Sequence, residues 1–341
     1  MTDTTVASDA PASAPKPRRR WKRALAITGA VVGGLVLVLG TLGAWFLYAP
    51  APAEPELATQ VERRTLEVDG MTREYLAVVP DGLEDDAPVV LVFHGSRMDA
   101  EGVRAASGYR FDELAVERGF VAVYPEGYEQ TWHDCRAETP YPARLEDVDD
   151  VAFVRSVVAD VAALDGASAD AVFATGLSNG GHLSIRLSEE APDLVKAIAP
   201  FAAAYPAASN NVCEASGAAV PTMLVLGTDD PINPFEGGEA GTFGGSLGEV
   251  MSAQESAAFV AERNGLGMTP EVAAFTNTDA SGATDVTVAA YDGAAPVLLF
   301  SVDGGGHVVP NPVYSQPRIM GGTTAFLDGP LAAVDFFLGA P

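Results

Sequence analysis

Short apolar runs alternate with segments of helical pattern along most of this chain. Runs typical of strands fall at residues 65–68, 73–79, 89–93, 120–124, 171–174, 195–202, 222–226, 286–291 and 297–302. Helical patterns fall at 111–118, about 151–164, 182–190, 249–264 and 323–338. Strands that alternate with helices predict an α/β fold, with a mostly parallel sheet between two layers of helices. The Asp69-Gly70 pair favours a hairpin turn, so the first two strands should add an antiparallel edge.

The N-terminal 59 residues have a different pattern. An uncharged apolar run at 24–49 is long enough to span a bilayer, and basic residues at 16–23 predict a cytoplasmic N-terminus. We therefore expect a disordered basic tail at 1–23, a transmembrane signal anchor at 24–49, a proline-rich linker at 50–59 and a folded domain at 60–341. The alternative is a signal peptide cleaved near Ala49-Pro50-Ala51, after which the domain would be secreted. Both interpretations place the domain outside the cytoplasm.

The charge of the chain is strongly negative and unevenly distributed. The net charge is −26, from 20 basic and 46 acidic residues. Six of the basic and two of the acidic residues lie within positions 1–49. The rest of the chain therefore has 14 basic and 44 acidic residues. Such an acidic surface repels nucleic acid and argues against it as a partner. The 48% hydrophobic content is sufficient for a packed core.

A glycine-bracketed serine marks the candidate active site. The segment Gly176-Leu177-Ser178-Asn179-Gly180 follows an apolar run and precedes a helical pattern, which is the context of a nucleophile elbow. Small residues are needed beside the serine because the turn is strained and tightly packed. A plain Gly/Ser turn between strand and helix is the alternative. The backbone N–H of Asn179, at the helix start, would be one oxyanion donor, and Ser96 or Arg97 would supply the other.

A serine nucleophile needs a base, and the base needs an orienting acid. Among the four histidines, only His307 lies in a loop after a late strand, where a parallel sheet builds its site. The acid should follow the strand at 222–226, where Asp229 and Asp230 are both candidates. Their alternative role is a simple Asp-Pro turn. In the long loop at 126–145, Trp132 and His133 are candidates for substrate contact, and exposure to solvent is the alternative for His133.

Taken in order, these segments resemble the secreted α/β-hydrolases that include polyhydroxybutyrate depolymerases, feruloyl esterases and acetylxylan esterases. The resemblance covers about residues 60–340 and rests on segments 92–96, 123–127, 131–136, 149–153, 176–181, 227–231 and 304–307. It implies an α/β-hydrolase fold, with Asp230 as the acid and His307 as the base. The chain departs from the family pattern at His133, where asparagine is common, and at Val308-Val309-Pro310, where Thr-Trp-Pro is common. These departures affect the substrate more than the mechanism.

Two cysteines, Cys135 and Cys213, lie in the domain predicted to be exported, where pairing is favoured over two free thiols. The scattered histidines suggest no metal site, and no cofactor motif is evident. Ser178 and Asp230 are 52 positions apart, an interval that leaves no room for a large cap domain. Loops at 126–145 and 231–248 should cover the site instead, the second being glycine-rich and mobile.

The sequence therefore predicts an exported serine esterase without a cofactor. Ser178 would attack a carboxylic ester, His307 would carry the proton, Asp230 would orient the imidazole, and Asn179 and Ser96 would bind the oxyanion. Expected substrates are short-chain acyl esters, polyhydroxyalkanoate esters, or feruloyl and acetyl esters on polysaccharides. Polymeric esters are among the expected substrates. The N-terminal helix would contact the membrane. The alternatives are a serine peptidase on the same fold and a catalytically silent surface binding module.

Overall fold

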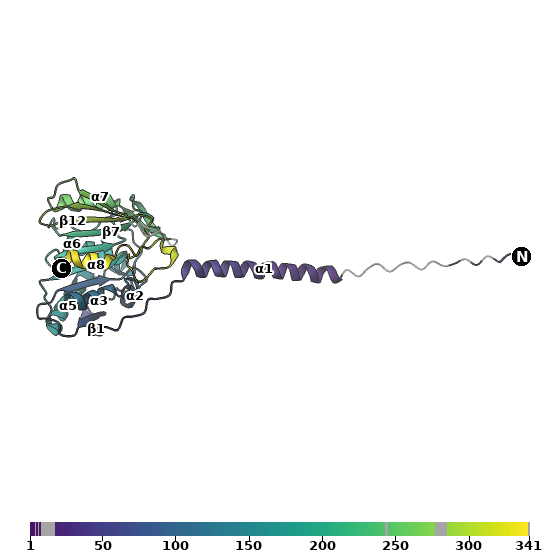
Figure 1. Ribbon diagram of the computed structural model, residues 1–341, viewed down its shortest axis with the longest axis horizontal. Helices are drawn as coiled ribbons and strands as arrows, with labels where there is room; N and C mark the ends of the chain where they lie inside the picture. Colours follow the sequence, from purple (N-terminus) through teal and green to yellow (C-terminus); the bar gives the residue numbers. More distant parts are fainter. Residues whose placement is uncertain (4, 6, 8–17, 243–244, 277–284, 340–341) are drawn as a thin grey trace. The chain divides into compact units, whose positions relative to one another are not determined.

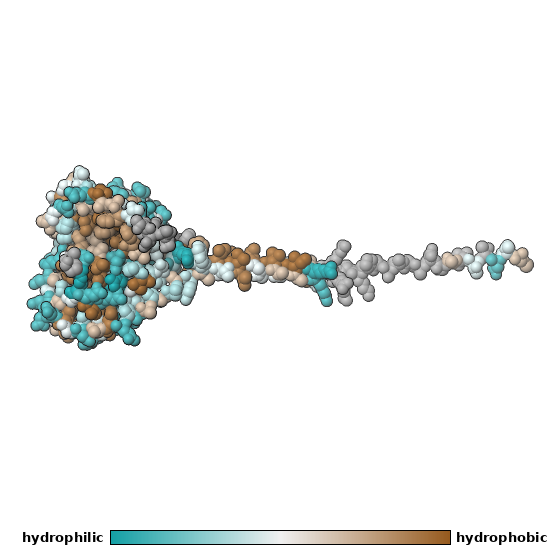
Figure 2. Space-filling model, in the orientation of Figure 1, coloured by the Kyte–Doolittle hydropathy of each residue, from teal (hydrophilic) through white to brown (hydrophobic). Residues whose placement is uncertain are grey.

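The chain forms two compact units, Met1–Tyr48 and Ala49–Pro341. A computed structural model describes all residues except 4, 6, 8–17, 243–244, 277–284 and 340–341. In the first unit, helix α1 (Arg18–Leu47) includes a 27-residue span, Trp21–Leu47, with a mean hydropathy of 2.3. A helix of this length measures about 40 Å, which exceeds the ~30 Å hydrocarbon core of a bilayer. Apolar residues cover this helix (Figure 2), so it fits either a signal anchor or a signal sequence.

A ten-stranded sheet forms the centre of the second unit (Figure 1). Its spatial order is β1 (Thr59–Val68), β2 (Met71–Pro80), β4 (Val121–Pro125), β3 (Val89–Phe93), β5 (Val172–Leu177), β6 (Ala197–Phe201), β7 (Thr222–Gly227), β12 (Val297–Val302), β11 (Val286–Tyr291) and β10 (Glu271–Phe275). The six strands from β4 to β12 run parallel, and antiparallel pairs flank them at both edges. The predicted mostly parallel α/β-hydrolase sheet is confirmed.

Helices cover both faces of this sheet because successive strand residues point to opposite sides. In β3, Leu91 and Phe93 join one core, and Val90 and Val92 join the other. The first core includes residues of α5 (Asp150–Asp165), α6 (Asn179–Glu190) and α7 (Ala253–Arg263). The second includes residues of α2 (Ala100–Ala106), α3 (Arg110–Arg118) and α8 (Gly329–Leu338). Two short helices, α4 (Pro142–Leu145) and η1 (Arg318–Met320), lie in loops.

The glycine-rich segment 231–248 was expected to be a loop, but strands occupy half of it, with residues 243–244 outside the described part. Strands β8 (Gly238–Thr242) and β9 (Gly245–Val250) pair in antiparallel fashion and bury Leu247 and Val250. The buried Asn210 side chain donates hydrogen bonds to the carbonyls of Leu247 and Glu249, so the hairpin is held against a neighbouring segment. The many glycines hid the alternation of apolar residues that would have indicated strands.

The remaining differences from the sequence expectations are the start points of two helices and two elements that were not expected. Helix α7 begins at Ala253 rather than 249, because Ser252 and Glu255 form a capping box there. Helix α8 begins at Gly329, after the cap Asp328, rather than at 323. Helix α2 and strand β10 were not expected. Between β6 and β7 the chain forms a single irregular connection at 202–221, so the prediction that no cap domain is inserted there is confirmed.

Candidate active site

Ser178 occupies a strained turn between β5 and α6. Its φ of 57° and ψ of −117° are unfavourable for a residue with a side chain, and such strain is typical of functional turns. A Cβ at Gly176 would lie 2.6 Å from the carbonyl carbon of Gly180, and one at Gly180 would lie 2.3 Å from the carbonyl oxygen of Phe93. Both positions therefore require glycine, and the nucleophile-elbow geometry follows from the sequence.

His307 and Asp230 meet at the ends of neighbouring strands β12 and β7. The His307 Nδ1 lies 2.8 Å from Oδ2 and 3.0 Å from Oδ1 of Asp230, and both side chains are almost fully buried. The Asp230 Oδ1 also accepts hydrogen bonds from the N–H groups of Ile232 and Asn233, each over 2.8 Å. Asp229 is exposed, and its N–H donates to the carbonyl of Gly305. Of the two candidate aspartates, the structure brings only Asp230 to the imidazole.

Ser178 and His307 line one cavity of about 270 Å³. Its described lining comes from four parts of the chain: Gly95–Met98 beyond β3, Pro140 and Tyr141, the segment that contains Ile232 and Gly245–Leu247, and Gln316 with Met320; Leu177 completes it. The loops at 126–145 and 231–248 were expected to cover the site, and both contribute. The contribution from the segment at 316–320 was missed, because nothing in that irregular stretch marks it as part of the site.

The hydrogen bonds of the loop after β3 distinguish Ser96 from Arg97 as an oxyanion donor. The Arg97 N–H donates to the carbonyl of Gln130 over 2.9 Å, so it is occupied. Within the described residues, neither the Ser96 N–H nor the Asn179 N–H has an acceptor. A Cβ built on Gly95 would lie 3.6 Å from the Cβ of Ser178, so this loop packs directly against the serine. The geometry thus favours Ser96 over Arg97.

His94 holds the peptide bond that precedes Ser96. Its ring Nδ1 lies 2.8 Å from the Gly95 carbonyl, and its Nε2 accepts a hydrogen bond from the Gly127 N–H over 2.8 Å. Burial lowers the pKa of His94 to about 4, so the ring is neutral and carries its proton on Nδ1. In a trans peptide the C=O and the next N–H point in opposite directions. Fixing the Gly95 carbonyl therefore also fixes the direction of the Ser96 N–H.

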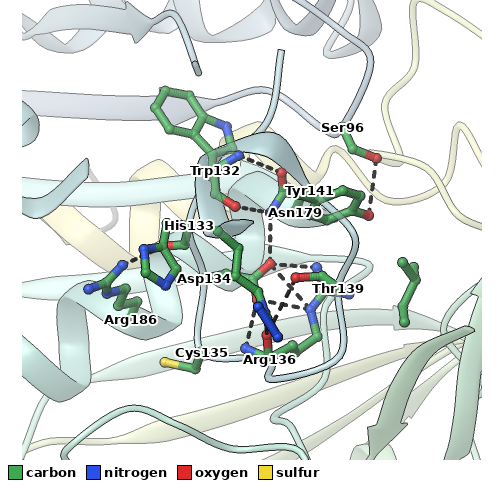
Figure 3. A network of polar contacts seen from close by, with 12 residues as sticks. Ser96, Trp132, His133, Asp134, Cys135, Arg136, Thr139, Tyr141, Asn179 and Arg186 are labelled. Carbon is green, nitrogen blue, oxygen red and sulfur yellow. Dashed lines mark hydrogen bonds and ion pairs between the residues drawn. The ribbon is translucent and has the colours of Figure 1, made fainter. Parts of the chain in front are cut away.

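Asn179 is held by the loop at 131–141, which we call the clamp loop (Figure 3). The Asn179 Oδ1 accepts a hydrogen bond from the Trp132 N–H over 2.8 Å, and its Nδ2 donates to the Trp132 carbonyl over 3.1 Å. The same Nδ2 donates to the Asp134 Oδ2 over 2.7 Å. On the other side of the site, the Tyr141 hydroxyl donates to the Ser96 Oγ over 3.3 Å. One loop thus contacts both candidate oxyanion residues.

A buried ion pair and a disulfide stabilise the clamp loop. Asp134 and Arg136 are each about 1% exposed and form a pair with an N–O distance of 2.5 Å. Burial acts to raise the pKa of Asp134, but the charge of Arg136 and its hydrogen bonds outweigh this effect and hold it below the ordinary value. Cys135 and Cys213 form a disulfide with a Cα–Cα distance of 5.0 Å. The predicted pairing is confirmed, and it ties the loop to the 202–221 connection.

Trp132 and His133 do not line the cavity, contrary to the expectation that they contact substrate. Trp132 is fully buried, packs edge-on against Phe93, and donates its indole N–H to the His94 carbonyl over 2.9 Å. The His133 side chain is 13% exposed, and its backbone N–H donates to the buried Asp150. The contacts of Trp132 hold its side chain in the core, whereas the His133 Nδ1 lies 3.3 Å from the Val148 carbonyl and 3.6 Å from the exposed Asp147. Among the described residues, no group of three or more His, Cys, Asp or Glu side chains is placed to hold a metal ion.

Comparison with known proteins agrees with this architecture. The model of the dienelactone hydrolase family matches residues 74–241. The chain is 30% identical over 324 residues to NocK of Nocardia uniformis subsp. tsuyamanensis, a predicted esterase, and the match covers 85% of this chain and 91% of NocK. The acetyl xylan esterase from Aspergillus awamori superposes with a TM-score of 0.50 at 17% identity, covering 73% of this chain and 95% of that enzyme, which shows a shared fold. The chain therefore belongs to the dienelactone hydrolase family and is a carboxylic ester hydrolase.

Proposed function

We propose that this protein is an exported serine esterase that uses Ser178, His307 and Asp230 as its catalytic triad. The observation that carries the proposal is the hydrogen bond between the His307 Nδ1 and Asp230, beside a cavity that Ser178 and His307 both line. Asp230 fixes the tautomer in which Nδ1 carries the proton, so the Nε2 of His307 is free to act as a base. The fixed N–H groups at Ser96 and Asn179 supply the electrostatic part of the mechanism.

The reaction follows from these positions. The Ser178 Oγ attacks the ester carbonyl while the His307 Nε2 takes its proton, and Asp230 stabilises the imidazolium that forms. The backbone N–H groups of Ser96 and Asn179 donate to the oxyanion of the tetrahedral intermediate. His307 then protonates the departing alcohol, which leaves an acyl group on Ser178. Water, deprotonated by His307, cleaves this acyl-enzyme through the same steps.

The substrate class is the finer part of the proposal. We infer that the enzyme hydrolyses esters with short acyl groups, including accessible esters on polymers such as polyhydroxyalkanoates or feruloylated and acetylated polysaccharides. The cavity supports this view, because its volume of about 270 Å³ lies below the ~300–1,000 Å³ of pockets for drug-sized ligands. It is built from loops and from the β9 edge of the hairpin rather than from a cap domain.

A substrate panel tests the proposal. Purified protein should be assayed on 4-nitrophenyl butyrate, methyl ferulate and a hydroxybutyrate oligomer. A butyryl anilide, which has the same acyl group as the first ester, tests for amide hydrolysis. We expect turnover of at least one ester, little turnover of the anilide, and loss of ester turnover in Ser178→Ala. Ser209→Ala is a matched control, because Ser209 is exposed and does not line the cavity. Anilide turnover that exceeds ester turnover would favour a peptidase, and no turnover of any substrate would oppose the proposal.

We further propose that α1 is an uncleaved signal anchor, with residues 1–23 in the cytoplasm and the catalytic domain outside. The 27-residue apolar span, the basic residues before it and the disulfide support this orientation. Protease added to intact cells should digest the catalytic domain while a cytoplasmic marker survives. Recovery of a soluble protein that begins near residue 50 would instead establish a cleaved signal sequence.

A further inference from the structure

The Ser96 side chain brings a hydrogen-bond donor to the active-site cavity. Ser96 lines the cavity together with Ser178 and His307. Its Oγ accepts a hydrogen bond from the Tyr141 hydroxyl over 3.3 Å (Figure 3), and within the described part of the chain this is the only hydrogen bond of that side chain. A serine hydroxyl has one proton to donate besides its acceptor sites. The Ser96 O–H is therefore available to a ligand in the cavity.

The backbone holds Ser96 against the turn that contains Ser178. The carbonyl of Gly95 accepts a hydrogen bond from the Met98 N–H over 3.2 Å, which closes a turn around Ser96. A Cβ built on Gly95 would lie 3.4 Å from the Leu177 carbonyl oxygen and 3.6 Å from the Ser178 Cβ, which is ordinary van der Waals contact. The Ser96 hydroxyl is therefore attached to a fixed backbone directly beside the strained turn.

A buried cation lies next to Tyr141. The guanidinium carbon of Arg136 is 5.7 Å from the centroid of the Tyr141 ring. Burial acts to lower the pKa of Arg136, but the charge of Asp134 outweighs this effect and holds that pKa above its ordinary value, so the guanidinium is charged. A positive charge near a phenol stabilises negative charge on its oxygen, and this makes the phenol a stronger donor. The hydrogen bond from Tyr141 to Ser96 is strengthened accordingly.

Arg136, Tyr141 and Ser96 thus form a polarised chain that ends at the cavity. Hydrogen bonds that follow one another in such a chain strengthen each other, so donation from Tyr141 makes the Ser96 O–H a better donor in turn. The acceptor that benefits most from a strengthened donor is an oxygen that gains negative charge during the reaction. The oxyanion of the tetrahedral intermediate is such an oxygen, and the Ser96 N–H is already one of its proposed donors.

We propose that the Ser96 hydroxyl is a third oxyanion donor, and that Tyr141 is a positioning residue that orients and polarises this hydroxyl. The inference rests on the proposed esterase function and adds a side-chain donor to the backbone N–H groups of Ser96 and Asn179. The carbonyl oxygen of a bound ester is a weak acceptor, whereas the oxyanion is a strong one. The added hydrogen bond therefore stabilises the transition state more than the bound substrate.

Ser96→Ala tests the donor, because it removes the hydroxyl and keeps the backbone N–H. It should lower kcat on 4-nitrophenyl butyrate about 30-fold and change KM less than about twofold, since loss of one oxyanion donor costs up to ~10²–10³ in kcat. Ser209→Ala is the matched control, because Ser209 is exposed and lies outside the cavity lining. Thermal unfolding of each variant confirms that it is folded.

Tyr141→Phe tests the positioning role, because it keeps the ring beside Arg136 and removes only the hydroxyl. It should lower kcat about fivefold. The double variant Ser96→Ala/Tyr141→Phe should be no slower than Ser96→Ala alone, because Tyr141 acts only through Ser96, whereas an independent structural role would add its own loss. Tyr128→Phe is the control, because the Tyr128 hydroxyl donates to the surface residue Glu146 over 2.8 Å and does not line the cavity.

A transition-state analogue reports the oxyanion itself. A serine adds to the carbonyl of 1,1,1-trifluoro-2-pentanone, and the anionic hemiketal that forms resembles the tetrahedral intermediate of butyrate ester hydrolysis. The inhibition constant should rise about 30-fold in Ser96→Ala and about fivefold in Tyr141→Phe, in parallel with the losses in kcat. It should stay unchanged in Ser209→Ala and Tyr128→Phe.

Any of four results would overturn the third donor: a loss in kcat below about threefold in Ser96→Ala, an unchanged inhibition constant in that variant, a larger loss in Tyr141→Phe than in Ser96→Ala, or additive losses in the double variant. These results differ from failure of the proposed function. If the unaltered protein hydrolyses esters and Ser96→Ala keeps its kcat, the third donor is excluded and the esterase proposal stands. If the unaltered protein hydrolyses no ester, the esterase proposal fails first.

Discussion

The side-chain amide of Asn179 donates a hydrogen bond to the carboxylate of Asp134 over 2.7 Å, although 45 residues separate the two positions. The same carboxylate pairs with the buried Arg136 guanidinium. The residue after Ser178 is therefore connected to an ion pair in the clamp loop, at 131–141, which the Cys135–Cys213 disulfide fixes to another segment. The geometry at Ser178 thus depends on the stability of a loop that itself carries no catalytic group.

Two ion pairs at opposite extremes of burial test how strongly the clamp loop depends on Asp134. Asp134→Asn should lower the free energy of unfolding by about 3–5 kcal/mol, because it leaves the charge of Arg136 buried and uncompensated. Asp193→Asn removes the partner of Arg155 in a pair that is 43% and 69% exposed, and should cost less than about 1 kcal/mol. Urea denaturation with the disulfide intact measures both, and equal losses would contradict the account.

Two adjacent aspartates allow a matched test of the proposed acid. Asp230→Asn should lower kcat by as much as about 10⁴-fold, because an amide partner favours the wrong imidazole tautomer, as in a serine-protease triad. Asp229→Asn should change kcat by less than about threefold, because the Asp229 side chain is exposed. The described hydrogen bond from Asp229 to the His307 loop comes from its backbone N–H, which the substitution keeps. Steady-state kinetics on one ester provide both values. A larger loss in the Asp229 variant would refute the assignment.

The sequence predicts the elbow because its requirements are local. Gly176 and Gly180 are needed wherever a serine turn packs this closely against a strand, so the pattern alone indicates Ser178. His307 and the pair Asp229 and Asp230 could also be predicted, because the ends of parallel strands lie along one edge of the sheet. The choice of Asp230 within that pair came from the family resemblance. These expectations depend on spacing and on the fold, both of which a sequence contains.

The cavity wall could not be predicted in the same way. Tyr141, Gln316 and Met320 come from irregular segments whose positions depend on distant contacts. Trp132 was expected at the substrate because such long loops are usually functional. Hydrogen bonds to Asn179 and His94 instead hold it in the core. Non-local contacts of this kind leave no periodic signal in a sequence.

The buried His94 predicts a pH dependence of stability. Its pKa is lowered by burial from 6.5 to about 4, so between these values the unfolded chain binds more protons than the folded protein. Stability should therefore fall as the pH falls from about 6.5 to 4, and His94 should contribute about 3 kcal/mol to that loss.

A variant isolates this contribution. In His94→Gln, the unfolding free energy should change less steeply with pH than in the unaltered protein. The difference in slope should correspond to the uptake of up to one proton on unfolding. His133→Gln serves as control, because His133 is partly exposed and lies outside the cavity. Urea denaturation between pH 4.5 and 7 gives the slopes, and parallel curves for His94→Gln and the unaltered protein would contradict the prediction.

The cavity volume predicts a limit on acyl length. Esters of about two to six acyl carbons should be hydrolysed well and esters beyond about ten carbons poorly, because the small cavity leaves the extra methylenes unburied. Each CH₂ that a deeper pocket buried could add about 0.8 kcal/mol of binding. A series of 4-nitrophenyl esters measures this dependence. A kcat/KM that still rises through ten carbons would show a pocket deeper than the one described here.

Covalent labelling of Ser178 tests the central claim most directly. A fluorophosphonate reacts with a serine only when a neighbouring base activates it, so it reports the assembled triad without knowledge of the substrate. Intact-mass analysis of the purified protein should show one stoichiometric adduct, and peptide mapping should place it on Ser178. Ser178→Ala should not be labelled, and His307→Gln should be labelled far more slowly. No adduct on the unaltered protein, or an unchanged adduct on Ser178→Ala, would contradict the account.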